Sequence, residues 1–131
     1  MDRAGTERDI TLLRDLVAID TTSERSNVPA IDLAAQRLDR PGIELVRMPV
    51  HDGKENMVAI VGELDGTGSG LLLAGHLDCV PPGDGWASPA FDLQERDGRL
   101  HGRGACDMKG FDAMAINLVE EAADRGLTRP L

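Results

Sequence analysis

The sequence contains few aromatic residues and only two cysteines among its 131 residues. With two Phe, one Trp and no Tyr, a folded core must consist of aliphatic side chains. Cys79 and Cys106 form no CxxC pair and no disulfide framework, so we expect reduced thiols. No apolar run approaches the ~20 residues that a membrane span needs. Residues 1–8 also lack the hydrophobic segment of a signal peptide, so we expect a cytoplasmic protein without a membrane partner.

Basic residues are fewer than acidic residues. Fourteen Lys and Arg stand against 23 Asp and Glu, which leaves a formal net charge of −9. A nucleic-acid partner is therefore not expected, because binding a phosphate backbone requires clustered basic side chains. Apolar residues make up 41% of the chain and charged residues 28%, as in ordinary globular proteins. We therefore expect a folded domain.

Helical spacing of the apolar residues predicts three helices. They cover about residues 7–18, the stretch from Pro29 to about residue 38, and residues 108–125 up to Gly126. Strands are predicted at 43–48 and 57–61, with a turn at Asp52-Gly53 between them. A further pair at 91–93 and 99–101 flanks a turn at Arg96-Asp97-Gly98.

Leu71-Leu72-Leu73-Ala74-Gly75 predicts one more strand. This run is continuously apolar, which is typical of a strand covered on both faces in an α/β sheet. We therefore predict that residues 71–75 form the centre of the sheet. The order of helices and strands predicts one α/β layer structure without a second domain.

Two polar side chains follow this predicted strand. In an extended segment, residues i and i+2 point the same way, so His76 and Asp78 share a face while Leu77 turns into the core. Such a pair can supply a metal ligand and the carboxylate that orients it, and ligands in open α/β sheets gather beyond the carboxyl ends of strands. The alternative is a surface histidine beside a solvated aspartate.

A second chemical motif is the glycine-rich run from Gly102 to Gly110. Its three glycines permit backbone conformations that other residues avoid, so the turn can hold the carboxylate of Asp107 at an unusual angle at the start of a helix. The spacing fits neither common phosphate-binding loop. The alternative is that Asp107 is only a helix N-cap.

Together these segments resemble a known family. Gly75-His76-Leu77-Asp78, Trp86-Ala87-Ser88-Pro89-Ala90-Phe91 and the run from Arg96 to Phe111 are similar to the co-catalytic zinc peptidases. That family includes acetylornithine deacetylase, succinyl-diaminopimelate desuccinylase, aminoacylases and glutamate carboxypeptidases. Residues 19–23 and the helix from Pro29 also resemble the N-terminal segment of the proteins in this family. The fold implied is the N-terminal part of an α/β/α sandwich with a mixed, mostly buried central sheet.

The resemblance also implies roles for individual residues. His76 would bind one metal ion and Asp107 would bridge two. Asp78 would contact His76 and orient it without binding a metal ion itself. Asp107-Met108 matches the place of a cis peptide bond in the family. The implied cofactor is Zn²⁺, two per complete site, with Co²⁺ or Mn²⁺ as alternatives. Two such ions suit amide hydrolysis because they polarise the carbonyl, activate a shared water and stabilise the oxyanion.

The resemblance further implies parts that this sequence does not contain. The family's general base is the first of two adjacent glutamates that follow a further strand. Glu120-Glu121 lies within the third predicted helix, so we expect it to be a solvated helix face. Residues 1–131 would then be the N-terminal portion of the catalytic domain, without the lid or dimerisation domain. We expect this chain alone to have no appreciable deacylase activity.

The closest resemblance is to acetylornithine deacetylase. The implied substrate is a small N-acyl amino acid, foremost N-acetylornithine in arginine biosynthesis, and the full-length protein could be a homodimer. Succinyl-diaminopimelate, other N-acyl amino acids and short peptides are alternative substrates. A different class of function is a small non-catalytic module with a closed metal site made by His76, Asp78 and Asp107, joined by Cys79, Cys106 or His101.

Overall fold

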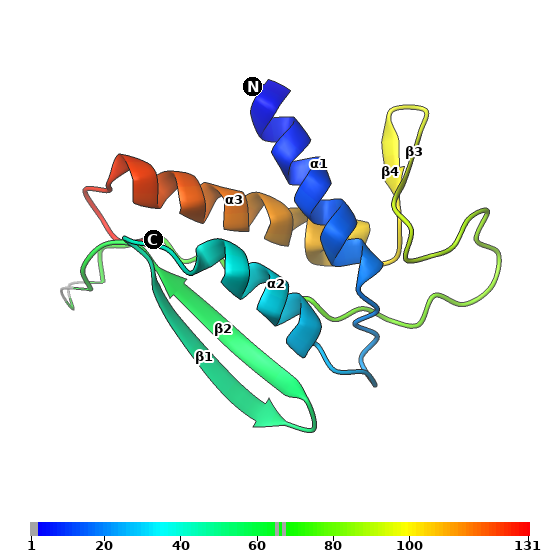
Figure 1. The fold of residues 1–131 in the computed structure, drawn as a ribbon, viewed down its shortest axis with the longest axis horizontal. Helices are drawn as coiled ribbons and strands as arrows, with labels where there is room; N and C mark the ends of the chain where they lie inside the picture. Colours follow the sequence, from blue (N-terminus) through cyan, green and yellow to red (C-terminus); the bar gives the residue numbers. More distant parts are fainter. Residues whose placement is uncertain (1–2, 65, 67) are drawn as a thin grey trace.

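The computed structural model describes residues 3–64, 66 and 68–131 (Figure 1). Its elements, in chain order, are α1 (Arg3–Ala18), α2 (Val28–Leu38), β1 (Glu44–His51), β2 (Lys54–Ile60), β3 (Gln94–Arg96), β4 (Arg99–His101), the π-helical turn η1 (Ala105–Lys109) and α3 (Gly110–Arg125). Among the described residues, no helix has both the length and the apolar character needed to cross a membrane.

The three helices pack together and form most of the core. Figure 1 shows α3 beside α1, while α2 lies between α3 and the β1–β2 hairpin. Aliphatic residues one helical turn apart make these contacts, as the sequence predicted. The buried members include Leu12, Leu16 and Val17 of α1, Ala30, Ala34 and Leu38 of α2, and Ala113, Ile116 and Val119 of α3. Each large side chain buried in this way contributes about 1.5–3 kcal/mol.

The hairpin predicted at 43–61 is confirmed, and so is the turn of the second hairpin, but the strand predicted at 91–93 is wrong: it lies at Gln94–Arg96, because the two-residue turn at Asp97-Gly98 pairs the residues directly on either side of it. β1 pairs with β2 and β3 pairs with β4, each antiparallel. The two turns have positive φ at both central residues, 45° and 73° at Asp52 and Gly53, and 52° and 68° at Asp97 and Gly98. Asp-Gly pairs favour this turn type, whose twist matches the strands on either side. Local sequence therefore specifies these hairpins.

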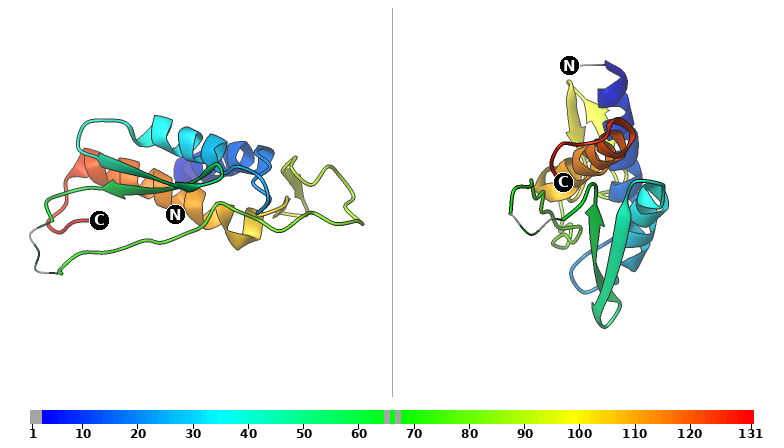
Figure 2. Two further views of the ribbon diagram at one scale, coloured as in Figure 1. Left: turned by 90° about the horizontal axis from the view of Figure 1, so that it is seen from below. Right: turned by 90° about the vertical axis from the view of Figure 1, so that its left-hand side faces the viewer.

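The strand predicted at residues 71–75 is wrong. The α/β class is confirmed, but the described residues form two separate two-stranded sheets, and 71–75 belongs to neither. Figure 2 shows the segment as an unpaired stretch. Leu71 and Leu72 are 59% and 82% exposed, so no mixed, mostly buried central sheet is present in this part of the chain. An apolar run becomes a strand only when a neighbouring backbone completes the hydrogen-bond ladder.

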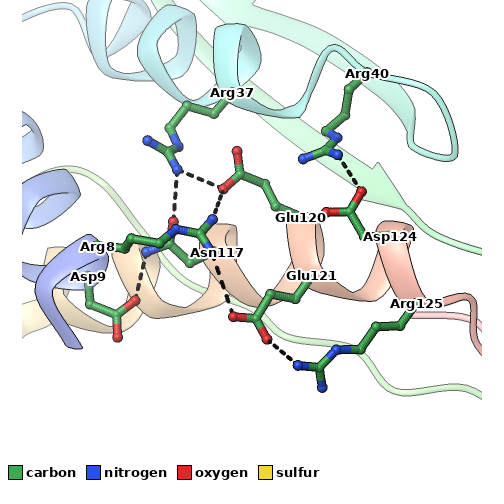
Figure 3. A network of polar contacts seen from close by, with 9 residues as sticks. All are labelled: Arg8, Asp9, Arg37, Arg40, Asn117, Glu120, Glu121, Asp124 and Arg125. Carbon is green, nitrogen blue, oxygen red and sulfur yellow. Dashed lines mark hydrogen bonds and ion pairs between the residues drawn. The ribbon is translucent and has the colours of Figure 1, made fainter. Parts of the chain in front are cut away.

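The expectation that Glu120 lies on a solvated helix face is also wrong. Its side chain is buried and accepts hydrogen bonds from Arg8 of α1 at 2.9 Å and Arg37 of α2 at 2.7 Å (Figure 3). Arg37 also donates to Asn117 of α3 at 3.0 Å. Glu121 is half-exposed and contacts Arg8 at 3.7 Å. The network joins all three helices, so Glu120 has a structural role.

Candidate metal centre

The first part of the site is the segment from His76 to Asp78. The imidazole Nδ1 of His76 lies 3.1 Å from the backbone oxygen of Asp78 and 3.3 Å from its carboxylate Oδ1. Leu77 packs against the core. The prediction that His76 and Asp78 face the same way, with Leu77 turned inward, is therefore confirmed.

Residues 21–23, which lie shortly after the end of α1 at Ala18, hold this segment in place. The backbone of Cys79 donates to Thr21 at 3.2 Å and accepts from Ser23 at 3.0 Å, which makes a parallel bridge. The hydroxyl of Thr21 donates to the carbonyl of Leu77 at 2.5 Å. The hydroxyl of Ser23 donates to Oδ2 of Asp78 at 2.8 Å, so the carboxylate that faces His76 is itself oriented. Sequence reasoning assigned no role to Ser23, because the contact joins residues 55 apart.

The second part of the site is the glycine-rich turn that carries Asp107. Gly104 has a φ of 79°, and its carbonyl accepts a hydrogen bond from the backbone of Lys109 at 2.9 Å. Asp107 and Met108 interrupt the helical geometry, and the peptide bond between them is cis, as the resemblance implied. The side chain of Asp107 is 86% exposed.

Lys109 ties this turn to α1. The side chain is fully buried, and its Nζ donates to the carbonyls of Leu16 and Ile19 at 2.9 Å each. These carbonyls lie at the C-terminal end of α1, where the helix dipole favours a cation. Burial lowers the pKa of Lys109. Sequence reasoning did not predict this contact, since it joins residues about 90 apart along the chain.

The two parts meet at His76 and Asp107. The Nε2 atom of His76 lies 3.1 Å from Oδ1 of Asp107. A carbonyl and a carboxylate accept hydrogen bonds, so this arrangement without a metal ion suits an imidazole protonated on both nitrogens. Burial alone would lower the pKa of His76, but the hydrogen bonds to Asp78 and Asp107 and their negative charges outweigh it and raise the pKa.

The same geometry fits a divalent metal ion. With Nδ1–H donated to the carbonyl of Asp78, the neutral imidazole presents the Nε2 lone pair toward Asp107, which is how metal-binding histidines are commonly held. Two ligands of one tetrahedral zinc ion, each about 2.0–2.2 Å from it, lie about 3.3–3.5 Å apart. The observed 3.1 Å is close to that separation, so a metal ion could take the place of the shared proton.

A cleft of about 200 Å³ opens beside this pair. It is lined by His76, Asp78, Cys79, Val80, Gly102, Arg103, Gly104, Cys106 and Asp107. Arg103 stacks over Trp86, 5.2 Å from the ring centroid, and both side chains donate to the carbonyl of Pro82. These contacts attach the loop after Val80 to the glycine-rich turn, which gives the cleft a fixed wall.

The cleft does not contain a complete metal site. Within the ranges that the structure describes, no group of three or more His, Cys, Asp or Glu side chains is placed to hold a metal ion. Cys79 is buried, Cys106 is exposed, and both are free thiols. His101 lies in β4 and does not line the cleft. The closed site of the alternative hypothesis is therefore not formed by the described residues.

Known hydrolases match this sequence over most of its length. The family model of peptidase family M20/M25/M40 matches residues 72–131. The chain is 49% identical over 112 residues to an acetylornithine deacetylase of Myxococcus xanthus, covering 80% of this chain and 28% of that protein. It is 37% identical over 120 residues to a succinyl-diaminopimelate desuccinylase of Gluconacetobacter diazotrophicus, covering 91% of this chain and 31% of that protein.

The fold matches a solved peptidase. The crystal structure of human carnosine dipeptidase 1 superimposes with a TM-score of 0.75 at 28% sequence identity, covering 97% of this chain. The matched part is 31% of the dipeptidase chain. Across the three relatives, this chain therefore spans only 28% to 31% of their length.

Proposed function

We propose that this chain, whose residues 72–131 match the model of peptidase family M20/M25/M40, forms part of a metal-dependent hydrolase that cleaves the amide bond of N-acyl amino acids. The observation that carries the proposal is the approach of His76 Nε2 to Asp107 Oδ1 at 3.1 Å, with the other imidazole nitrogen held by Asp78. These two side chains come from segments 31 residues apart and meet at one cleft.

Each of three residues has a proposed role. His76 would hold one metal ion through Nε2, and the carboxylate of Asp107 would serve as a ligand to a pair of ions. Asp78 is a positioning residue that fixes the tautomer and orientation of His76, with Ser23 holding its second oxygen at 2.8 Å. Two zinc ions bound there would supply Lewis acidity toward the scissile carbonyl and a water of lowered pKa.

The described residues do not supply the rest of such a site. Hydrolysis needs a carboxylate base near the attacking water, and Glu120 is instead buried between Arg8 and Arg37. Catalytic zinc generally has three protein ligands, and only His76 and Asp107 are available here for direct binding. We therefore propose that the 131-residue chain has no appreciable deacylase activity by itself.

N-acetylornithine is the proposed substrate, in arginine biosynthesis. The support is the identity of 49% to a protein named acetylornithine deacetylase, against 37% to one named succinyl-diaminopimelate desuccinylase.

A chimera tests both the reaction and the residue roles. Residues 1–131 would replace the matching part of the Myxococcus enzyme, and hydrolysis of N-acetylornithine and of N-succinyl-diaminopimelate would be measured. We expect deacetylation that a chelator abolishes. His76→Ala and Asp107→Ala should remove it, Asp78→Asn should lower kcat/KM by about 10- to 100-fold, and the control His101→Ala should leave it unchanged.

Folding of each chimera would be checked by circular dichroism. A folded chimera that keeps its activity without His76 or Asp107 would contradict the proposed ligand roles. A folded chimera that hydrolyses neither substrate would contradict the proposed hydrolase function.

A further inference from the structure

Lys109 is a fully buried cation that has no direct part in the proposed metal chemistry. Lysine is rarely buried in this way unless it pairs with an opposite charge. Among the described residues no carboxylate forms an ion pair with Lys109, and its Nζ donates instead to the carbonyls of Leu16 and Ile19. An apolar side chain of similar length would fill the same space without the cost of burying a charge. We therefore expect the ammonium group to contribute something besides packing.

The side chain of Lys109 lies where the two parts of the metal centre adjoin. A Cβ added at Gly104 would stand 3.3 Å from Cδ of Lys109 and 3.4 Å from Cβ of Cys79. The stem of Lys109 and the side chain of Cys79 thus both pack against Gly104. Segment 76–79 and turn 102–107 therefore meet at this stem, whose far end is bonded to α1.

The backbone of Lys109 also closes the turn. Its N–H donates to the carbonyl of Gly104 at 2.9 Å, and the next N–H, that of Gly110, donates to the carbonyl of Ala105. A Cβ added at Gly110 would stand 2.7 Å from that carbonyl oxygen, so glycine is needed for this close approach. Asp107 lies inside the loop that these two bonds close.

The carboxylate of Asp107 depends on the turn for its position. Its side chain is largely exposed, and in the described parts of the chain its hydrogen bond to His76 is the only one it makes. The carboxylate of Asp78, in contrast, is also held by Ser23. The backbone of the turn therefore places Asp107, and Lys109 is the side chain that fastens this backbone to α1.

We propose that Lys109 is a positioning residue for the metal centre, because it fastens turn 102–107 to α1 and to segment 76–79 and so sets the separation of His76 and Asp107. The inference rests on the proposed metal-binding roles of these two side chains. Lys109 itself contacts neither metal nor substrate. If it only stabilised the fold, its loss would lower stability and leave the contact between His76 and Asp107 unchanged in the folded chain.

Lys109→Met in the 131-residue chain tests the proposal, because methionine keeps an unbranched stem and lacks the ammonium group. The first readout is the nuclear Overhauser effect between the ring protons of His76 and the β-protons of Asp107, without metal. We expect Lys109→Met to lose this signal. Glu120→Gln is the matched control, since it also disturbs a buried charge that joins helices and should lower stability by a similar amount. It should keep the signal.

Zinc binding is the second readout, and here charge and position act in opposite directions. Removing a cation would by itself favour the binding of Zn²⁺, because like charges repel. Misplacing Asp107 weakens binding instead. We expect the NMR shift of the His76 imidazole to require about tenfold more zinc in Lys109→Met. The zinc concentration at half the full shift should stay the same in Glu120→Gln.

Several outcomes would overturn the proposal. A folded Lys109→Met chain that keeps the contact of His76 with Asp107, or that binds zinc at least as tightly as the original chain, would do so. Equal loss of the contact in Glu120→Gln, or its absence from the original chain, would do so as well. If Lys109→Met does not fold, Lys109→Gln keeps one N–H donor and should weaken the contact, and an unchanged contact there would again overturn the proposal.

Failure of the proposed function has a different signature. If zinc does not shift the imidazole of His76 in the original chain, the metal-binding role of His76 is contradicted. The contact measured without metal still decides whether Lys109 positions Asp107.

Discussion

Replacing Asp112 with Asn should change how the stability of this chain depends on pH. The carboxyl group lies at the start of α3, is 8% exposed, and has one oxygen without a partner. Burial raises the pKa of Asp112 from 3.8 to about 6, although the positive charges of His76 and Lys109 oppose the rise. The ionised form is therefore less favourable in the folded chain than in the unfolded chain.

The size and sign of the effect follow from that difference. One pKa unit corresponds to about 1.4 kcal/mol, so ionised Asp112 costs about 3 kcal/mol of folding free energy. Between about pH 4 and pH 6 the folded chain keeps a proton that the unfolded chain releases, so the contribution of Asp112 to stability falls as pH rises. Asp112→Asn lacks this loss, and its stability relative to the original chain should rise by about 2.4 kcal/mol between pH 4 and pH 8.

Urea unfolding followed by far-ultraviolet circular dichroism at a series of pH values would measure the difference. Asp84→Asn, in an exposed loop, is the matched control and should show no such change. A free-energy difference for Asp112→Asn that is constant across this pH range would refute the reasoning. A difference that moves in favour of the original aspartate as pH rises would refute it as well.

Three other predictions concern single contacts. Lys109→Met should lower the free energy of unfolding by about 1–3 kcal/mol and speed amide exchange at the end of α1, since two carbonyls lose their donor; unchanged exchange there would contradict the contact. Glu120→Gln should cost about 2 kcal/mol in urea unfolding because two arginines lose a buried partner. Glu121→Gln should cost less than about 0.5 kcal/mol, and equal costs would argue against the network. The imidazole of His76 should titrate above the usual range by NMR, and Asp78→Asn should lower its pKa by removing a negative charge while keeping the backbone carbonyl; an unchanged titration would show that the Asp78 carboxylate does not contribute.

Elements defined by local sequence were predictable. The helical periods and the Asp52-Gly53 and Asp97-Gly98 turns are set by residues a few positions apart, and both turns formed as expected, although β3 lies three residues later than predicted. The approach of His76 to Asp107 was also predicted, from the resemblance of their two segments to a known family, whereas their role in metal binding stays a prediction.

Features that depend on distant partners were not predictable. The apolar run at residues 71–75 indicated a strand, but a strand needs a paired backbone, which residues 130–131 supply only at Leu71. The environment of Glu120 depends on arginines from two other helices. Lys109 and Ser23 likewise find their partners 93 and 55 positions away. Spacing within one segment carries no information about such contacts.

A zinc titration followed by NMR of the histidine side chains tests the central claim most directly. The chain has three histidines, His51, His76 and His101, so the imidazole that responds can be identified. We predict that zinc shifts the Nε2 resonance of His76 alone, with weak affinity because the described residues offer only two direct ligands, and that Asp107→Ala abolishes the shift. Zinc binding that spares His76, or that persists at full strength without Asp107, would contradict the account.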